Sequence, residues 1–257
     1  MIKLIVSDID GTILNAGESK VSPEILEAFD KLSKSGIKLC FASGRSDKSM
    51  KSILGQFSDT AFFISSDGAC MTSAGKVLYT RPISISDILK ITRADIYRSL
   101  TLTVTTPTEN YIISGTHSAL KESRGDTSTE SFKATDSLYS IKEQIIKVSV
   151  FSESFTPKPL LNLPPSLRVC YNSNGWCEYV SAICNKGLAV SDLQMRLFMS
   201  KLDTACFGDG ENDVDMMKKA CISVSVNNSA KILDTVCSFH TDDIAKTLLQ
   251  IARKGSI

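Results

Sequence analysis

The sequence MIKLIVSDIDGTIL (residues 1–14) decides the fold that we expect for this chain. Its apolar run IKLIV (residues 2–6) predicts a buried strand, because short continuous apolar runs are typical of strands covered on both faces. Two carboxylates one residue apart, Asp8 and Asp10, end the run, and Gly11 and Thr12 follow them. The chain thus delivers two like charges to the tip of an interior strand, and this placement requires a chemical reason.

Short β-rich runs alternate with amphipathic segments after this first strand. Ser22 and Pro23 are typical of the first positions of a helix, and apolar side chains then recur at helical spacing up to Gly36, which is typical of a helix end. A second strand, a second helix and a third strand are predicted within residues 37–65. This order favours a parallel sheet with right-handed crossovers, and hence a Rossmann-like α/β core.

The same alternation returns in the last third of the chain, whereas the middle third differs. Segments such as residues 101–106 and 145–151 are rich in β-branched side chains and mix with proline-rich loops. We therefore predict a Rossmann-like core formed by residues 1–81 and 184–257, with an inserted α+β domain at residues 82–183.

Charge and hydropathy limit the classes of partner. The 257 residues include 29 Lys and Arg against 28 Asp and Glu, without a block of like charge, so a nucleic acid or an anionic membrane surface is not indicated. No apolar stretch approaches the roughly 20 residues of a membrane helix, and the N-terminal run is too short for a signal peptide. We expect a cytoplasmic protein, a monomer or homodimer, with a small-molecule partner.

The eight cysteines lie mostly inside apolar runs and form no C-x-x-C pair. This distribution favours reduced, buried thiols over disulfides or a zinc site.

The tip of a parallel strand is where α/β sheets bind ligands. Two carboxylates held together there are reasonable if a cation lies between them, or if one stays protonated to act as an acid. Magnesium prefers oxygen ligands and commonly takes one or two carboxylates plus substrate phosphate, so Asp8 is a candidate ligand.

Further candidates come from distant segments. Asp209 follows the strand-like residues 204–207, and Asn212 and Asp213 come shortly after it. A hydroxyl with neighbouring backbone amides at Ser43 and Gly44, and an ammonium just before a helix at Lys186, complement a phosphate dianion. Two further candidate residues each have two possible roles. Asn212 is either a helix cap or a polar group near the metal, and Arg45 is either a solvated loop cation or a substrate contact.

The segments DIDGT, ASGR, NKG and GDGEND resemble, in order, the four motifs of the haloacid dehalogenase (HAD) superfamily. The insert between the second and third motifs is similar to the type IIB α/β cap of Cof-type sugar-phosphate phosphatases. The resemblance implies a magnesium-dependent phosphatase of small phosphorylated metabolites, with a sugar phosphomutase or a non-catalytic binding protein on the same fold as alternatives.

The resemblance also implies roles for individual residues. Asp8 would attack phosphorus and form an aspartyl-phosphate, while Asp10, oriented by Thr12, would protonate the leaving oxygen and later activate water. Ser43 and Lys186 would hold the phosphoryl oxygens. Mg²⁺ would be bound by the Asp8 side chain, the Asp10 backbone carbonyl and Asp209, with Asp213 orienting the ligands.

One position departs from the family pattern. The third strand is followed by SSDGAC, which places Asp67 where the family usually has an asparagine near the substrate. The extra negative charge would repel a phosphorylated ligand, or select a hydroxyl-rich or cationic one.

Overall fold

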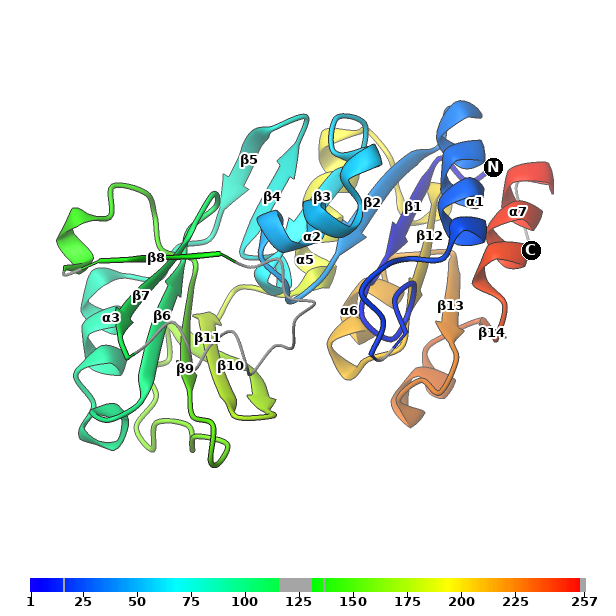
Figure 1. The fold of residues 1–257 in the computed structure, drawn as a ribbon. Helices are drawn as coiled ribbons and strands as arrows, with labels where there is room; N and C mark the ends of the chain where they lie inside the picture. Colours follow the sequence, from blue (N-terminus) through cyan, green and yellow to red (C-terminus); the bar gives the residue numbers. More distant parts are fainter. Residues whose placement is uncertain (16, 116–130, 136, 255–257) are drawn as a thin grey trace.

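A computed structural model describes all residues except 16, 116–130, 136 and 255–257, and it shows two lobes, each built on one sheet (Figure 1). The first sheet has the order β14-β13-β12-β1-β2-β3-β4-β5, and neighbours from β14 to β3 pair in parallel. The predicted Rossmann-like α/β core is therefore confirmed. Its strands are β1 (Leu4–Ser7), β2 (Lys38–Ala42), β3 (Phe62–Ser65), β4 (Cys70–Ser73), β5 (Lys76–Thr80), β12 (Thr204–Gly208), β13 (Ile222–Val226) and β14 (Phe239–Thr241).

Helices cover both faces of this sheet because side chains alternate along its strands. Ile5 packs into the cluster formed with α1 (Pro23–Lys34), α2 (Asp47–Ile53) and α7 (Ile244–Lys254). Its neighbours Leu4 and Val6 pack on the other face, against α5 (Lys186–Arg196) and α6 (Val214–Met217). The run IKLIV is thus apolar throughout because β1 is buried on both sides.

The start of α1 follows the predicted pattern. The Ser22 side chain accepts a hydrogen bond from the backbone N–H of Ile25 at 3.4 Å, and Pro23 is the first helical residue. Gly36 adopts a φ of 83° just beyond the helix end, a conformation that glycine reaches without strain.

The second sheet has the order β10-β11-β9-β6-β7-β8 and lies between β5 and β12 in the sequence. With α3 (Ile85–Thr92) it forms the expected α+β insert; the domain boundaries at residues 82 and 183 stay a proposal. The strands are β6 (Thr101–Thr105), β7 (Asn110–Ser114), β8 (Phe132–Ala134), β9 (Lys147–Phe151), β10 (Leu167–Ser173) and β11 (Trp176–Ser181).

The two faces of the second sheet differ in chemistry. Val148 and Val150 on β9 and Tyr179 on β11 join an apolar cluster with α3. The side chains that alternate with them include Lys147 and Glu178, which are charged and yet buried. This polar face is turned toward the first lobe, because the Lys147 ammonium donates to the carbonyl of Gly44 in that lobe at 3.2 Å.

Three strands of the first sheet, β4, β5 and β14, were not predicted from the sequence. Strands β4 and β5 form an antiparallel hairpin, closed by Ala74 and Gly75 at φ angles of 47° and 72°. Positive φ at both turn residues matches the right-handed twist of the strands. At the opposite edge, the three-residue strand β14 pairs with β13.

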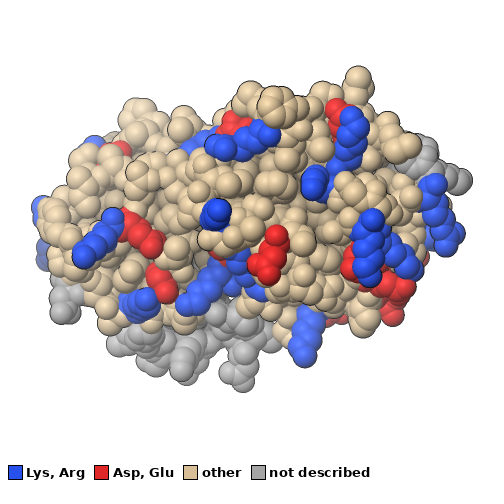
Figure 2. All heavy atoms as spheres, turned by 90° about the horizontal axis from the view of Figure 1, so that it is seen from above, with Lys and Arg blue, Asp and Glu red and all other residues tan. Residues whose placement is uncertain are grey.

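The distribution of surface charges and the state of the cysteines can be compared with the expectations from the sequence. Basic and acidic side chains are interspersed on the face shown in Figure 2. All eight cysteines are free thiols; five of them are buried as predicted, and Cys170, Cys221 and Cys237 are partly exposed. Among the residues that the structure describes, no helix combines the length and the apolar character that crossing a membrane requires.

Candidate active site

The site lies where neighbouring parallel strands end. Asp8 directly follows β1, Asp209 follows β12 and Ser43 follows β2. From β1 the chain proceeds to β2 and β3 on one side of the sheet, whereas β12, β13 and β14 extend the other side. The ends of β1 and β12 therefore form the switch point at which α/β sheets open a ligand crevice.

Lys186, the first residue of α5, joins two of the predicted acids. Its ammonium lies 2.6 Å from an Asp8 oxygen and 2.7 Å from an Asp213 oxygen, and its side chain is only 1% exposed. Burial disfavours the charge on Lys186, but Asp213 and Asp8 outweigh it and raise the pKa of the ammonium above its usual range. Burial raises the pKa of the Asp8 carboxyl well above its ordinary value, and Lys186 opposes that change.

Asp213 is fully buried and uses both of its oxygens. One accepts from Lys186, and the other accepts from the backbone N–H groups of Asp209, at 3.1 Å, and Gly210, at 2.9 Å. These bonds fix the loop that carries Asp209 after β12. Asp213 thus orients the neighbouring groups of the site.

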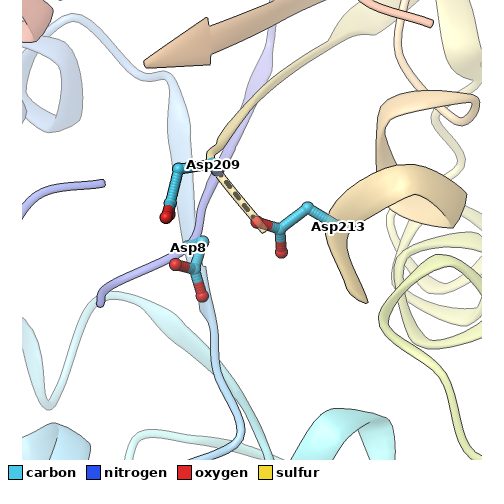
Figure 3. Close-up of side chains that lie close together, drawn as sticks. All are labelled: Asp8, Asp209 and Asp213. Carbon is cyan, nitrogen blue, oxygen red and sulfur yellow. Dashed lines mark hydrogen bonds between the residues drawn. The ribbon is translucent and has the colours of Figure 1, made fainter. Parts of the chain in front are cut away.

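Asp8, Asp209 and Asp213 each offer an oxygen within 4.8 Å of the others, and Figure 3 shows Asp8, which follows β1, beside the two acids of the connection between β12 and α6. Burial raises the pKa of Asp209, and a 2.7 Å hydrogen bond from the Thr12 hydroxyl opposes this. An all-oxygen set of partly buried carboxylates fits a hard divalent cation such as Mg²⁺.

Thr12 contacts the Asp209 side chain, and Gly11 leaves space for it. The Thr12 hydroxyl contacts Asp209 and, at 3.4 Å, Asp8, so the expectation that it orients Asp10 is wrong. Gly11 has a φ of 82°, and a Cβ there would lie 2.1 Å from an Asp209 oxygen. A glycine is therefore required by conformation and by space.

We expect Gly11→Ala to destabilise the fold by ~2–3 kcal/mol, because it adds a clash with Asp209 to the cost of a positive φ. Gly36→Ala is the matched control, since Gly36 has nearly the same φ but open space around a Cβ. Urea unfolding measures both variants. Equal losses of stability in the two would show that the clash with Asp209 has no effect.

Asp10 lies at the rim of the site, with a side chain that is 51% exposed. Arg45 holds its carboxylate in a bidentate ion pair, with N–O distances of 2.6 and 2.8 Å, and Ser43 contacts it at 3.4 Å. Arg45 is thus a partner of Asp10 and not a solvated cation.

Asn212 does not cap α6. Its amide donates to Asp67 at 3.0 Å, and the residue before α6 is Asp213. The buried Asp67 also lies close to the backbone of Gly44, where an added Cβ would be 3.2 Å from the Asp67 carboxylate. The departure from the family pattern therefore lies inside the site.

A cavity of about 700 Å³ opens over these groups and is lined by both lobes. The first lobe contributes candidate residues at the ends of its strands, namely Asp8, Asp10, Ser43, Gly44, Arg45, Asp209 and Asn212. The second lobe contributes Lys147 and Glu178, an ion pair at 3.1 Å, together with side chains of the β10–β11 hairpin. Trp176 lines the cavity and also packs on Phe151, with ring centroids 4.6 Å apart.

Sequence reasoning missed Asn227. It has a φ of 52° after β13, and its amide donates to the carbonyl of Gly11 at 3.0 Å, which ties this loop to the loop of Asp8 and Asp10. The asparagine preference for positive φ was the available signal.

Comparisons with known proteins agree with this geometry. The chain matches the model of a family described as haloacid dehalogenase-like hydrolase over residues 5–247. It is 22% identical to the 5-amino-6-(5-phospho-D-ribitylamino)uracil phosphatase YbjI of Escherichia coli, over 93% of this chain and 90% of the relative. It is 23% identical to the HMP-PP phosphatase of Cronobacter sakazakii, over 89% of this chain and 85% of the relative.

A solved structure shares the fold over nearly the whole chain. The HAD subclass IIB sugar phosphatase BT4131 superimposes with a TM-score of 0.81 at 17% identity, covering 97% of this chain and 98% of that one.

Proposed function

Because this chain belongs to the haloacid dehalogenase-like hydrolases, we propose that it is a magnesium-dependent phosphatase of small phosphorylated metabolites, sugar phosphates among them. The single observation that carries the proposal is the contact of the buried Lys186 ammonium with Asp8 and Asp213 beside Asp209. Relatives named for phosphatase activity on small molecules, and a structural neighbour named as a sugar phosphatase, support the substrate class.

In the proposed first step, an Asp8 oxygen attacks phosphorus and the bond between phosphorus and the leaving oxygen breaks. Asp10 donates a proton to that oxygen, so an alcohol departs and an aspartyl-phosphate remains. In the second step, Asp10 takes a proton from water, whose oxygen attacks phosphorus. Inorganic phosphate leaves and the Asp8 carboxylate is restored.

The surrounding residues position these groups. Lys186 favours the ionised form of Asp8 and, with the Ser43 hydroxyl and the Gly44 backbone, holds the phosphoryl oxygens. Arg45 fixes the Asp10 carboxylate at the rim, where it can reach the leaving group.

Mg²⁺ would be held by Asp8, Asp209 and the Asp10 carbonyl, with Asp213 orienting them, and it would offset the negative charge gathered on the carboxylates and the phosphoryl oxygens. The three clustered side-chain carboxylates fit this role. The second lobe would cover the site and exclude water during the first step.

Hydrolysis of p-nitrophenyl phosphate tests the proposal. We expect turnover with Mg²⁺, loss to the uncatalysed rate after treatment with EDTA, and recovery when excess Mg²⁺ is restored, because the clustered carboxylates would otherwise repel the phosphate. A thermal-shift measurement in the same solutions separates metal removal from unfolding. Turnover that persists in EDTA would contradict the metal dependence.

A further inference from the structure

The charged side chains that line the cavity indicate which leaving groups of a phosphate ester the site accepts. The lining holds the carboxylates of Asp8, Asp10, Asp67, Glu178, Asp209 and Glu211, but only two basic side chains, Arg45 and Lys147. Each of these two is already in an ion pair, Arg45 with Asp10 and Lys147 with Glu178. The buried Lys186 ammonium is also paired, with Asp8 and Asp213. Among the described lining residues, every basic side chain therefore has a carboxylate partner.

Two of the carboxylates are not members of the Asp8, Asp209 and Asp213 cluster and come from different lobes. Asp67 follows β3, is 3% exposed, and is bound by the neutral amide of Asn212. Glu178 is on β11, is 6% exposed, and accepts from Ser149 at 3.0 Å as well as from Lys147. Neither residue has a role in the proposed phosphoryl transfer, although both line the cavity.

These two carboxylates face one region of the cavity. The Gly44 backbone lies between them, since it approaches Asp67 and its carbonyl accepts from the Lys147 ammonium that pairs with Glu178. The thiol of Cys170, which also lines the cavity, has its pKa raised by burial and then by Asp67 and Glu178. Lys147 and Arg168 oppose that change. The first lobe thus contributes the Asp67 carboxylate to this region, and the second lobe contributes the Glu178 carboxylate with its partner Lys147.

We propose that Asp67 and Glu178 select phosphate monoesters whose leaving group carries hydroxyl or amino groups and no second acidic group. The inference rests on the proposed phosphatase function and defines its substrate class. A carboxylate or a second phosphate on the leaving group would lie beside the Asp67 carboxylate, which has no ion pair among the described residues, and beside Glu178, whose cationic partner is shared with the Gly44 carbonyl. An ammonium or a hydroxyl there gains a charge-assisted hydrogen bond.

Competition against p-nitrophenyl phosphate tests the selection without requiring turnover of the competitor. The two probes are glucosamine 6-phosphate and 6-phosphogluconate, which have six-carbon skeletons and a single phosphate but carry an amine and a carboxylate, respectively. We expect the inhibition constant of 6-phosphogluconate to exceed that of glucosamine 6-phosphate by about tenfold or more in the wild type.

Asp67→Asn is the decisive variant. Asparagine tolerates the φ of 54° at this position, and its carbonyl can still accept from Asn212, so only the charge is removed. We expect the ratio of the two inhibition constants to fall severalfold. Glu178→Gln should shift the ratio in the same direction, while Glu27→Gln on α1, which pairs with Lys31, should not change it.

The possible results distinguish failure of the proposed substrate selection from failure of the proposed phosphatase function. Equal inhibition by the two probes in the wild type, inhibition by neither, or an unchanged ratio in Asp67→Asn would overturn the selection while magnesium-dependent hydrolysis of p-nitrophenyl phosphate stands. Absence of that hydrolysis would overturn the phosphatase function and the selection with it.

Discussion

Asp8→Asn is expected to lower the turnover of p-nitrophenyl phosphate by roughly four orders of magnitude or more, because the amide cannot form the aspartyl-phosphate. The amide has nearly the shape of the carboxylate, and Lys186 keeps its ion pair with Asp213 at 2.7 Å. The variant should therefore remain folded. Steady-state kinetics with saturating Mg²⁺, together with a thermal unfolding curve, measures both effects.

Asp30→Asn is the matched control for this prediction. It makes the same chemical change on α1, where Asp30 pairs with Lys34 at the surface, and it should retain wild-type turnover. An Asp8→Asn protein that stays folded and hydrolyses the ester at more than a few per cent of the wild-type rate would show that another group attacks phosphorus.

Lys186→Met is expected to have the largest combined effect on stability and activity. The substitution leaves the carboxylates of Asp8 and Asp213 buried without their shared cation, which should cost ~3–5 kcal/mol of unfolding free energy. Turnover should fall by roughly two to three orders of magnitude, because a positive charge at the phosphoryl oxygens is lost. Urea unfolding and p-nitrophenyl phosphate kinetics test the two parts.

A double variant separates the two effects of Lys186. Adding Asp213→Asn to Lys186→Met removes one of the stranded charges, so stability should recover in part while activity should not. If Lys186→Met alone unfolds at the same urea concentration as the wild type, the buried ion pairs do not stabilise the fold as described.

Local sequence patterns predicted the elements that place the site. The apolar run before Asp8, the helix start at Ser22 and Pro23, and the strand before Asp209 all have clear signals, because each reflects burial or capping within a few residues. Asp8 and Asp209 lie close together because they follow adjacent parallel strands, whose carboxyl ends meet at one edge. Lys186 contacts Asp8 from the first residue of α5.

The partners of side chains were harder to predict, because they depend on packing between distant segments. The ion pair of Lys147 with Glu178 joins two strands of the second sheet, and its contact with Gly44 joins the two lobes. The family resemblance implies that Thr12 orients Asp10, but its hydroxyl, next to the left-handed turn at Gly11, contacts Asp209. Neither outcome is encoded in local spacing.

The most direct test of the account is to trap the phosphoryl group on Asp8. In Asp10→Asn, p-nitrophenyl phosphate should still transfer its phosphoryl group, because p-nitrophenolate leaves without a proton, whereas hydrolysis should be slow without the base. Acid quenching and peptide mass analysis should then find one added phosphoryl group on the peptide that contains Asp8, and none in the Asp8→Asn, Asp10→Asn double variant. A burst of p-nitrophenolate with that peptide unmodified, or with the phosphoryl group on another residue, would contradict the account.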